Sequence, residues 1–286
     1  MSRLRALAHR ISRRRFIGAA GAASALLTLP AYAQNARLAW KTLEPGLDFA
    51  QTPSPLAPDG EDGVVSFLRV DPRRYRFSIL TARGNNDARK SPGDWARQFR
   101  CLAAINAGMY LKDYRTSVGY LRAGDLYVNP TLGADRTVAA FNGRDRGVPP
   151  FQIIDRTCQN FKALEPRYES LLQSIRLIDC NRRNVWKPDT RKWSIAALGA
   201  DKTGRAVFVH VKAPHMVHDF VNLLLALPLD LRNAMYLEGG REAALYVNAG
   251  GVMLEKTGLP RSDSLFGRVT TGPVEIPNVI GVLRRG

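Results

Sequence analysis

The stretch VVSFLRVDPRRYRFSIL (residues 64–80) decides the fold class. Its two ends, 64–70 and 75–80, are short runs rich in β-branched and aromatic residues, which are typical of strands. The four residues between them, DPRR (71–74), place proline at the second position of a tight turn. The sequence therefore predicts a β-hairpin here.

Further along the chain, predicted strands outnumber helices. A second hairpin is predicted for 195–211, across the turn DKTG (201–204). Ser91 and Pro92 fit the N-cap and first turn of a helix that ends near Arg100. The other predicted elements are helices at 166–172 and 217–227 and buried strands at 101–105, 234–240, 244–247 and 279–283. This order predicts a mixed α+β fold, with an antiparallel sheet core and a few packed helices, rather than a doubly wound parallel sheet.

The first 33 residues have the composition of an export signal. They contain six arginines and no acidic residue, an apolar stretch at 16–29, and an A-x-A site that predicts cleavage after Ala33. The apolar stretch is about 14 residues long, whereas crossing a bilayer takes about 20. The motif SRRRFI (12–17) favours a twin-arginine signal over an ordinary secretory one. We therefore expect a periplasmic or secreted protein that uses the twin-arginine export machinery.

The rest of the chain is expected to form a single domain. Residues 34–62 are rich in proline and glycine and weakly periodic, which predicts an irregular N-terminal segment. The domain itself is predicted at 63–286, a length that suits one core. After the signal no second apolar helix is found, so the mature protein is expected to be soluble.

The charge balance is basic, with 42 Lys and Arg against 25 Asp and Glu and a formal charge of +17. Without residues 1–33 the basic count falls to 36 and the charge to +11. Such a surface could associate with an anionic envelope surface or phosphate-linked glycans, or it could simply be solvated. Nucleic acid is not an expected partner, because the protein is exported and its basic residues lack the aromatic interleaving of a nucleic-acid module.

The three cysteines predict one structural bridge. Cys158 and Cys180 are expected to form a disulfide in an oxidising compartment. Cys101 lies in an apolar run and is expected to be a buried, unreactive thiol. The sequence has no cysteine cluster, dinucleotide fingerprint or phosphate loop, so no cofactor is predicted.

Two predicted strands end in a polar residue that is followed closely by glycine. Asn106 precedes Ala107-Gly108, and Glu238 precedes Gly239-Gly240. A glycine at such a point lets a ligand approach the backbone, and a polar group there lies at the mouth of the sheet. A partly buried Glu238 would have a raised pKa, which suits acid or base chemistry. On the pattern alone, an ion pair for Glu238 and a turn cap for Asn106 explain the residues as well.

Four pieces of the sequence resemble the phosphodiester glycosidase family, in the family's order: AAINAGMY (103–110), SVGYLRAGDLYVN (117–129), ALGADKTGRAVFVHV (197–211) and NAMYLEGGREAALYV (233–247). The resemblance covers most of the mature chain. The family includes the uncovering enzyme, which removes N-acetylglucosamine from a phosphodiester on mannose-type glycans. It implies that this chain is a hydrolase of sugar-1-phosphodiester bonds.

The same resemblance assigns residues to the site. Glu238 stands where many members have Asp in an Asp-Gly-Gly-Gly-Ser loop, but here only Gly239 and Gly240 follow, and Arg241-Glu242 replace Gly-Ser. The implied roles are base or charge stabiliser for Glu238, orientation of sugar hydroxyls or water for Asn106, and a grip on the leaving phosphate for Arg241.

Aromatic and histidine side chains complete the set of candidates. Tyr110 and Tyr120 could stack on a sugar ring, although packing within strands is an equal alternative. His218 is a candidate proton carrier. With His215 and His210 it could also form a metal site, although the spacing is weaker than that of a true zinc motif.

Three functions remain open from the sequence. The leading one is an exported hydrolase that cleaves a sugar-1-phosphodiester bond in an envelope or extracellular glycan. The alternative, which the altered glycine loop favours, is a non-catalytic envelope- or glycan-binding protein with the same fold. A metal-dependent hydrolase that uses the three histidines is the third.

Overall fold

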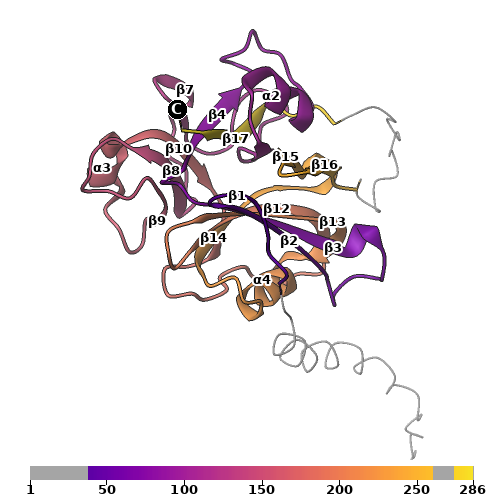
Figure 1. The fold of residues 1–286 in the computed structure, drawn as a ribbon. Helices are drawn as coiled ribbons and strands as arrows, with labels where there is room; N and C mark the ends of the chain where they lie inside the picture. Colours follow the sequence, from indigo (N-terminus) through magenta and orange to yellow (C-terminus); the bar gives the residue numbers. More distant parts are fainter. Residues whose placement is uncertain (1–37, 260–273, 286) are drawn as a thin grey trace, which may run out of the picture.

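A computed structural model describes residues 38–259 and 274–285, so the predicted signal at 1–33 lies outside the described residues. These residues form three antiparallel sheets, and short helices lie at the outside of the molecule (Figure 1). The mixed α+β fold with an antiparallel core is therefore confirmed. None of the helices in these two ranges is both long and apolar enough to span a bilayer.

The first sheet has seven strands. Their order across the sheet is β1 (Lys41–Glu44), β2 (Leu47–Pro53), β3 (Val64–Val70), β13 (Ala206–Met216), β12 (Lys192–Asp201), β14 (Leu231–Gly239) and β11 (Arg176–Ile178).

The other two sheets have five strands each. The second runs β7 (Leu126–Asn129), β6 (Leu121–Ala123), β10 (Tyr168–Ser174), β8 (Thr137–Gly143) and β9 (Phe151–Asp155). The third runs β16 (Val252–Thr257), β15 (Ala244–Ala249), β5 (Ala103–Asn106), β17 (Asn278–Arg284) and β4 (Tyr75–Thr81). The helices are α2 (Pro92–Phe99), α3 (Phe161–Leu164) and α4 (Val217–Ala226), with short 3₁₀ turns at η1 (Glu61–Gly63), η2 (Glu165–Arg167) and η3 (Gly240–Glu242).

All three sheets share one apolar core. One cluster contains Phe208 of the first sheet, Phe141 of the second and Phe77 of the third. The ring centroid of Phe77 lies 5.3 Å from that of Phe141 and 6.2 Å from that of Phe208. Side chains alternate along β12, so that Ala196 and Leu198 enter this core while neighbouring residues face α4. Helices α4, α2 and α3 pack in separate clusters on the outer sides of the three sheets.

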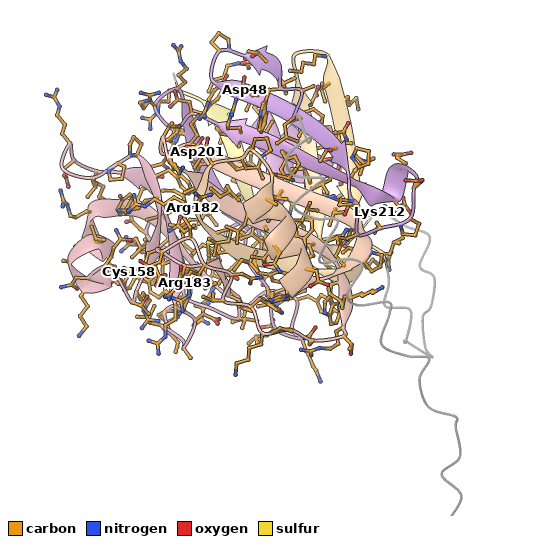
Figure 2. The ribbon with its side chains drawn as sticks, turned by 90° about the horizontal axis from the view of Figure 1, so that it is seen from below. Asp48, Cys158, Arg182, Arg183, Asp201 and Lys212 are labelled. Atoms are coloured by element: carbon orange, nitrogen blue, oxygen red, sulfur yellow. A yellow bond between two sulfur atoms is a disulfide. The ribbon has the colours of Figure 1, made fainter. Side chains whose placement is uncertain are left out.

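Several local predictions are confirmed. Helix α2 begins after Ser91, whose hydroxyl accepts a hydrogen bond from the backbone of Asp94 at 3.1 Å. Strands β12 and β13 form the second predicted hairpin, and in its turn the N–H of Gly204 donates to the carbonyl of Asp201 at 3.0 Å. Asp201, labelled in Figure 2, also accepts from Thr203 and Arg205, so the turn is held by its first residue.

The first predicted hairpin is wrong. Strands β3 and β4 lie where the sequence predicts them, but β3 pairs with β2 and β13, and β4 pairs with β17. The turn at 71–74 carries the chain from the first sheet to the third. Because most of β3 is buried, it needs a neighbour on each side, and these are β2, the strand before it in the chain, and the distant β13.

Two further predictions are corrected. Residues 166–172 are not helical: the 3₁₀ turn η2 ends at Arg167, and β10 then begins at Tyr168. Leu171 and Leu172 face opposite sides of the second sheet, and both are fully buried, which favours a central strand. Within the segment predicted to be irregular, 34–62, strands β1 and β2 extend the first sheet.

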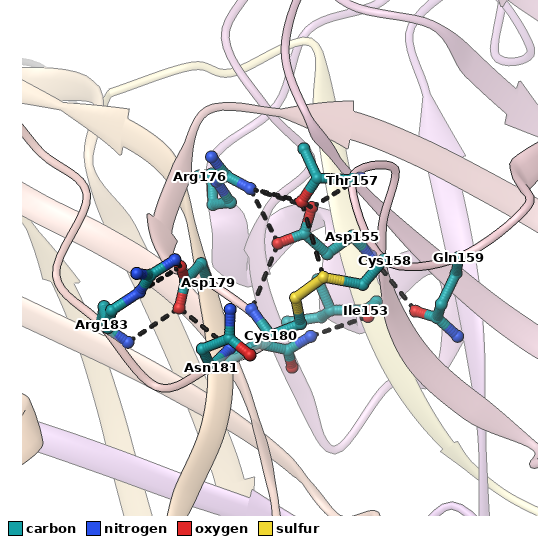
Figure 3. Close-up of a disulfide and its surroundings, with 11 residues drawn as sticks. Ile153, Asp155, Thr157, Cys158, Gln159, Arg176, Asp179, Cys180, Asn181 and Arg183 are labelled. Atoms are coloured by element: carbon teal, nitrogen blue, oxygen red, sulfur yellow. Dashed lines mark hydrogen bonds and ion pairs between the residues drawn. A yellow bond between two sulfur atoms is a disulfide. The ribbon is translucent and has the colours of Figure 1, made fainter.

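The predicted disulfide is confirmed. Cys158 and Cys180, 22 residues apart, are joined beside the buried carboxylate of Asp155 (Figure 3). Cys101 is a free cysteine in the described chain, and it is buried. Burial raises the pKa of its thiol to about 12, which agrees with the predicted unreactive state.

Replacing both bridged cysteines by serine is expected to lower the free energy of unfolding by about 3 kcal/mol, because the bridge limits the unfolded chain. In a protein of this size that corresponds to a Tm lower by about 6–12 °C. Thermal unfolding with and without a reductant measures the effect. The double variant should be insensitive to reductant, and a wild-type Tm that reductant leaves unchanged would contradict the assignment.

Candidate active site

The candidate site is the connection between β14 and β15, where the chain passes from the first sheet to the third. Glu238 lies one residue before the end of β14, and the short turn η3 (Gly240–Glu242) follows. Gly240 has a φ of +67°, a conformation that side chains other than glycine rarely adopt. Gly240, the second residue after the acid, is therefore required by the turn itself.

Glu238 is partly buried, and its Oε1 accepts a hydrogen bond from the N–H of Gly239 at 2.9 Å. Burial raises the pKa of Glu238 to about 8, the negative charge of Glu242 adds to the rise, and the Gly239 hydrogen bond opposes it. The carboxyl group is therefore largely protonated at neutral pH. This is the environment that turns a glutamate into a proton donor.

Two tyrosines lie within electrostatic reach of this acid. Burial raises the pKa of Tyr110, and the charges of Glu242 and Glu238 raise it further. The pKa of Tyr236 is raised by burial and by Glu238. Tyr110 therefore lies within range of the charges of Glu238 and Glu242.

Glu242 is a site residue that the sequence analysis did not propose. It appears there only as a departure from the family's loop, although its place four residues after Glu238 was the available signal.

Two tryptophans were also missed. The Trp186 ring lies 5.4 Å from that of Tyr236. The Trp193 ring lies beside Gly240, 3.8 Å from the position that a Cβ atom would take there. Both tryptophans are half-buried.

The Asn106 side chain contacts the backbone of the loop that carries Glu242. Its Nδ2 donates to the carbonyl of Glu242 at 2.8 Å, and its Oδ1 accepts from the N–H of Ala244 at 2.7 Å. The side chain is 1% exposed. Asn106 therefore ties the end of β5 to the loop that carries Glu242, and this position suits a fixed support better than a direct partner of a sugar.

Gly239 is closely packed against Tyr236. A methyl group at Gly239 would overlap the Tyr236 hydroxyl, and the backbone φ of −135° at Gly239 would otherwise accept alanine. Gly239→Ala is expected to cost about 1–3 kcal/mol through this overlap. Tyr236→Phe removes the hydroxyl and leaves the ring carbon 3.1 Å away, so it should recover part of the loss.

Urea unfolding of the wild type, both single variants and the double variant measures this coupling. Additive losses in the double variant would show that Gly239 and Tyr236 do not pack as described.

Not every predicted site residue joins the cluster. Tyr120 is 4% exposed, packs edge-on against Phe161 and Tyr127, and donates its hydroxyl hydrogen to Glu165 at 2.7 Å. It fills the core of the second sheet. Arg241 lies in η3 between the two glutamates, where its carbonyl accepts from the N–H of Gly258 at 3.2 Å.

The histidines occupy separate places. His218 is the second residue of α4, where its Nδ1 lies 3.1 Å from Asp219, and its carbonyl accepts a hydrogen bond from Asn184. His215 is buried, with Nε2 at 2.7 Å from the Ser54 hydroxyl. His210 is also buried, with Nε2 at 3.1 Å from the carbonyl of Ala243. These residues are all described, and they do not form a group of metal-ligand atoms.

In the described part of the chain, the one group with metal-ligand spacing is Asp155, Cys158 and Cys180. Since both sulfur atoms are in the disulfide, this group does not offer thiolate ligands.

The fold is that of an α+β protein of antiparallel sheets, and Glu238 and Glu242 lie at the connection between two of these sheets. A sequence profile of the phosphodiester glycosidase family matches residues 99–283. The chain belongs to the phosphodiester glycosidase family. Family and fold together support a glycosidase-type, hydrolytic function.

Solved structures show the same fold. The catalytic domain of zebrafish N-acetylglucosamine-1-phosphodiester alpha-N-acetylglucosaminidase, auto-inhibited by its pro-peptide, is 16% identical, with a TM-score of 0.61 over 86% of each chain. A hypothetical protein from Synechocystis is 14% identical, with a TM-score of 0.57 over 87% of this chain and 64% of the other. A proposed exported protein from Burkholderia pseudomallei is 11% identical, with a TM-score of 0.50 over 77% and 74%. Comparison with curated protein sequences gave no match.

Proposed function

We propose that this protein is an exported hydrolase that cleaves the bond between an anomeric carbon and phosphate in a phosphodiester-linked glycan of the cell envelope or its surroundings. The observation that carries the proposal is the pair Glu238, at the end of β14, and Glu242, at the end of η3, in which burial and the charge of Glu242 raise the pKa of Glu238 to about 8. A protonated acid beside a carboxylate is the arrangement that glycoside hydrolysis uses.

In this reaction the bond from the anomeric carbon to the phosphate oxygen breaks, and its electron pair leaves with the phosphate. Glu238 would donate its proton or a hydrogen bond to that oxygen, whereas the sequence suggested a base or charge stabiliser. The Glu242 carboxylate would stabilise positive charge on the sugar or take a proton from the attacking water. Arg241, between them in the chain, would hold the phosphate group.

The surroundings of the pair suit a sugar. Tyr110, Trp186 and Trp193 offer aromatic surface on which a sugar ring can stack. Gly240 would let the substrate approach the backbone, whereas the space beside Gly239 is filled by Tyr236. Asn106 would act through the loop rather than on the sugar. No step is assigned to His218, whose partners belong to α4 and to the segment after β11, or to Tyr120.

The test is release of sugar from a sugar-1-phosphodiester by the purified mature protein. Activity should fall above about pH 8, because the Glu238 proton is lost there. Absence of turnover with phosphodiester substrates of several sugars, at any pH between 5 and 9, would overturn the proposal.

Export is supported by the predicted signal at 1–33, and it would place the substrate among periplasmic or extracellular glycans. The formal charge of +11 on residues 34–286 suits an anionic envelope surface. Fusion of residues 1–40 to a reporter that is active only after twin-arginine export tests this. Lysine in place of Arg13 and Arg14 should stop export of the reporter.

The second candidate is a glycan-binding protein without catalysis. The altered loop favours it, because Arg241 and Glu242 stand where Gly and Ser are usual in the family. Binding to envelope polysaccharide that is unchanged in Glu238→Gln, without turnover by the wild type, would support this candidate.

A further inference from the structure

The turn that carries Glu242 is held from two directions. Asn106, at the end of β5 in the third sheet, binds the carbonyl of Glu242 and the N–H of Ala244. His210, on β13 in the first sheet, binds the carbonyl of Ala243 between them at 3.1 Å. Three consecutive residues are therefore fixed by side chains that lie outside the turn.

We propose that His210 is a positioning residue for the glutamate pair: its hydrogen bond to Ala243 holds the turn against the first sheet and so keeps Glu242 beside Glu238. The kinetic consequence rests on the proposed function, whereas the structural consequence does not.

The hydrogen bond to Ala243 fixes the tautomer of the His210 ring. A carbonyl oxygen can only accept, so Nε2 must carry the proton, and Nδ1 is then the bare nitrogen. Nδ1 is buried and has no hydrogen-bond partner in the described part of the structure. Burial, together with the charges of Lys256 and Lys212, lowers the pKa of His210 to about 4. The imidazole thus keeps one tautomer and no charge at neutral pH.

The turn depends on such support because it is short. Within η3 the N–H of Ala243 donates to the carbonyl of Gly240 at 3.1 Å, and the N–H of Gly258 donates to the carbonyl of Arg241. Without His210 the carbonyl of Ala243, a residue that is 0% exposed, would lose its partner inside the protein. An unsatisfied buried carbonyl favours movement of the backbone toward water. Such movement would separate Glu242 from Glu238 and admit water to Glu238.

The chain supplies a matched control. His215 lies on the same strand, is 2% exposed, and also contacts a backbone carbonyl, that of Ala213 at 2.7 Å. Its Nε2 lies beside the hydroxyl of Ser54 and its ring packs against Phe220, and none of these partners belongs to the turn. A general loss of stability from removing a buried histidine should therefore appear in both variants, while a loss of turn geometry should appear only in His210 variants.

The experiment is carboxyl ¹³C NMR titration of Glu238 in the wild type, His210→Leu, His210→Asn, His210→Gln and His215→Leu, with Glu238→Gln to assign the resonance. The pKa of Glu238, about 8 in the wild type, should fall by about one unit or more in the Leu and Asn variants as water enters. It should stay near the wild-type value in His210→Gln, whose amide can still donate, and in His215→Leu. An unchanged pKa in the Leu and Asn variants, or an equal fall in His215→Leu, overturns the proposal.

Two further readouts complete the test. Nitrogen-15 NMR of the wild type should show His210 protonated on Nε2, and a proton on Nδ1 overturns the proposal whichever variants fold. If the enzyme is active, His210→Leu should lower kcat by about 10- to 100-fold and change KM little, while His215→Leu, compared at a temperature where both are folded, should retain kcat. An inactive wild type would refute the proposed function, but the Glu238 titration would still decide the role of His210.

Discussion

Glu238→Gln is expected to remove hydrolysis of a sugar-1-phosphodiester and, at alkaline pH, to make the protein more stable. Glutamine keeps the shape of the side chain but cannot donate the carboxyl proton. Loss of a general acid typically lowers the rate by about 10²- to 10⁴-fold. The measurement is kcat/KM at pH 7, with Glu275→Gln as the control, because Glu275 is exposed and makes one long ion pair with Arg89 at 3.9 Å.

The gain in stability follows from the same raised pKa. The pKa of Glu238 rises from an ordinary 4.5 to about 8 on folding, so the folded state binds more protons between these values. Stability therefore falls as pH rises through this window, and it is fully reduced above about pH 8. Glutamine avoids the loss, which we put at about 1–3 kcal/mol because the side chain is only partly buried.

Thermal unfolding at several pH values measures this difference. The Tm of Glu238→Gln should match the wild type at pH 4 and exceed it by about 3–10 °C at pH 8.5. A difference in Tm that does not change with pH would argue against a buried, protonated Glu238.

Asp155→Ala is expected to cause the largest loss of stability, about 3–5 kcal/mol, or a Tm lower by about 10 °C. The Asp155 side chain is 0% exposed. It binds Arg176 at 2.9 Å, the backbone and hydroxyl of Thr157, and the N–H of Cys180 at 3.2 Å (Figure 3). Alanine would leave these donors without an acceptor and Arg176 without its counter-charge.

Urea unfolding of the variant measures the loss, and Asp230→Ala serves as control. Asp230 pairs with Lys202 at 3.2 Å, but both side chains are more than half exposed, so about 0–1 kcal/mol is expected there. Burial alone would raise the pKa of Asp155, but hydrogen bonds from Thr157 and Arg176 and the charge of Arg176 lower it overall. Its stabilising effect should therefore be present above about pH 4 and fade as pH falls further. A cost for Asp155→Ala no larger than for Asp230→Ala would contradict this account.

Local features of the sequence predicted local structure well. Ser91 and Pro92 begin a helix because a hydroxyl and a ring suit the first turn of any helix. The DKTG turn closes a hairpin because its hydrogen bonds lie within a few residues. The DPRR turn has equally good turn chemistry, yet its strands enter different sheets, since pairing depends on which distant strands bury β3 and β4.

The residues of the candidate site also differ in how well the sequence predicts them. Glu238 could be proposed because its own neighbours in the sequence predict a buried acid before a glycine turn. For Glu242 the sequence offered only its place four residues after Glu238, because what makes it a partner is the shape of η3 and the contacts of Asn106 with the backbone. Tyr120 and Tyr110 look alike in sequence, and only the packing of the second sheet shows that the Tyr120 ring is covered.

Asn106 holds the backbone of Glu242 and Ala244 rather than any side chain of the turn. The identity of the side chains at 241 and 242 is therefore not constrained by that attachment. Mutagenesis that randomises these two positions should yield mostly folded proteins, and among those that keep Glu242 the preference for a phosphate substituent can change at position 241 while the architecture persists. Members of one family could diverge in substrate by this route without any rearrangement of their sheets.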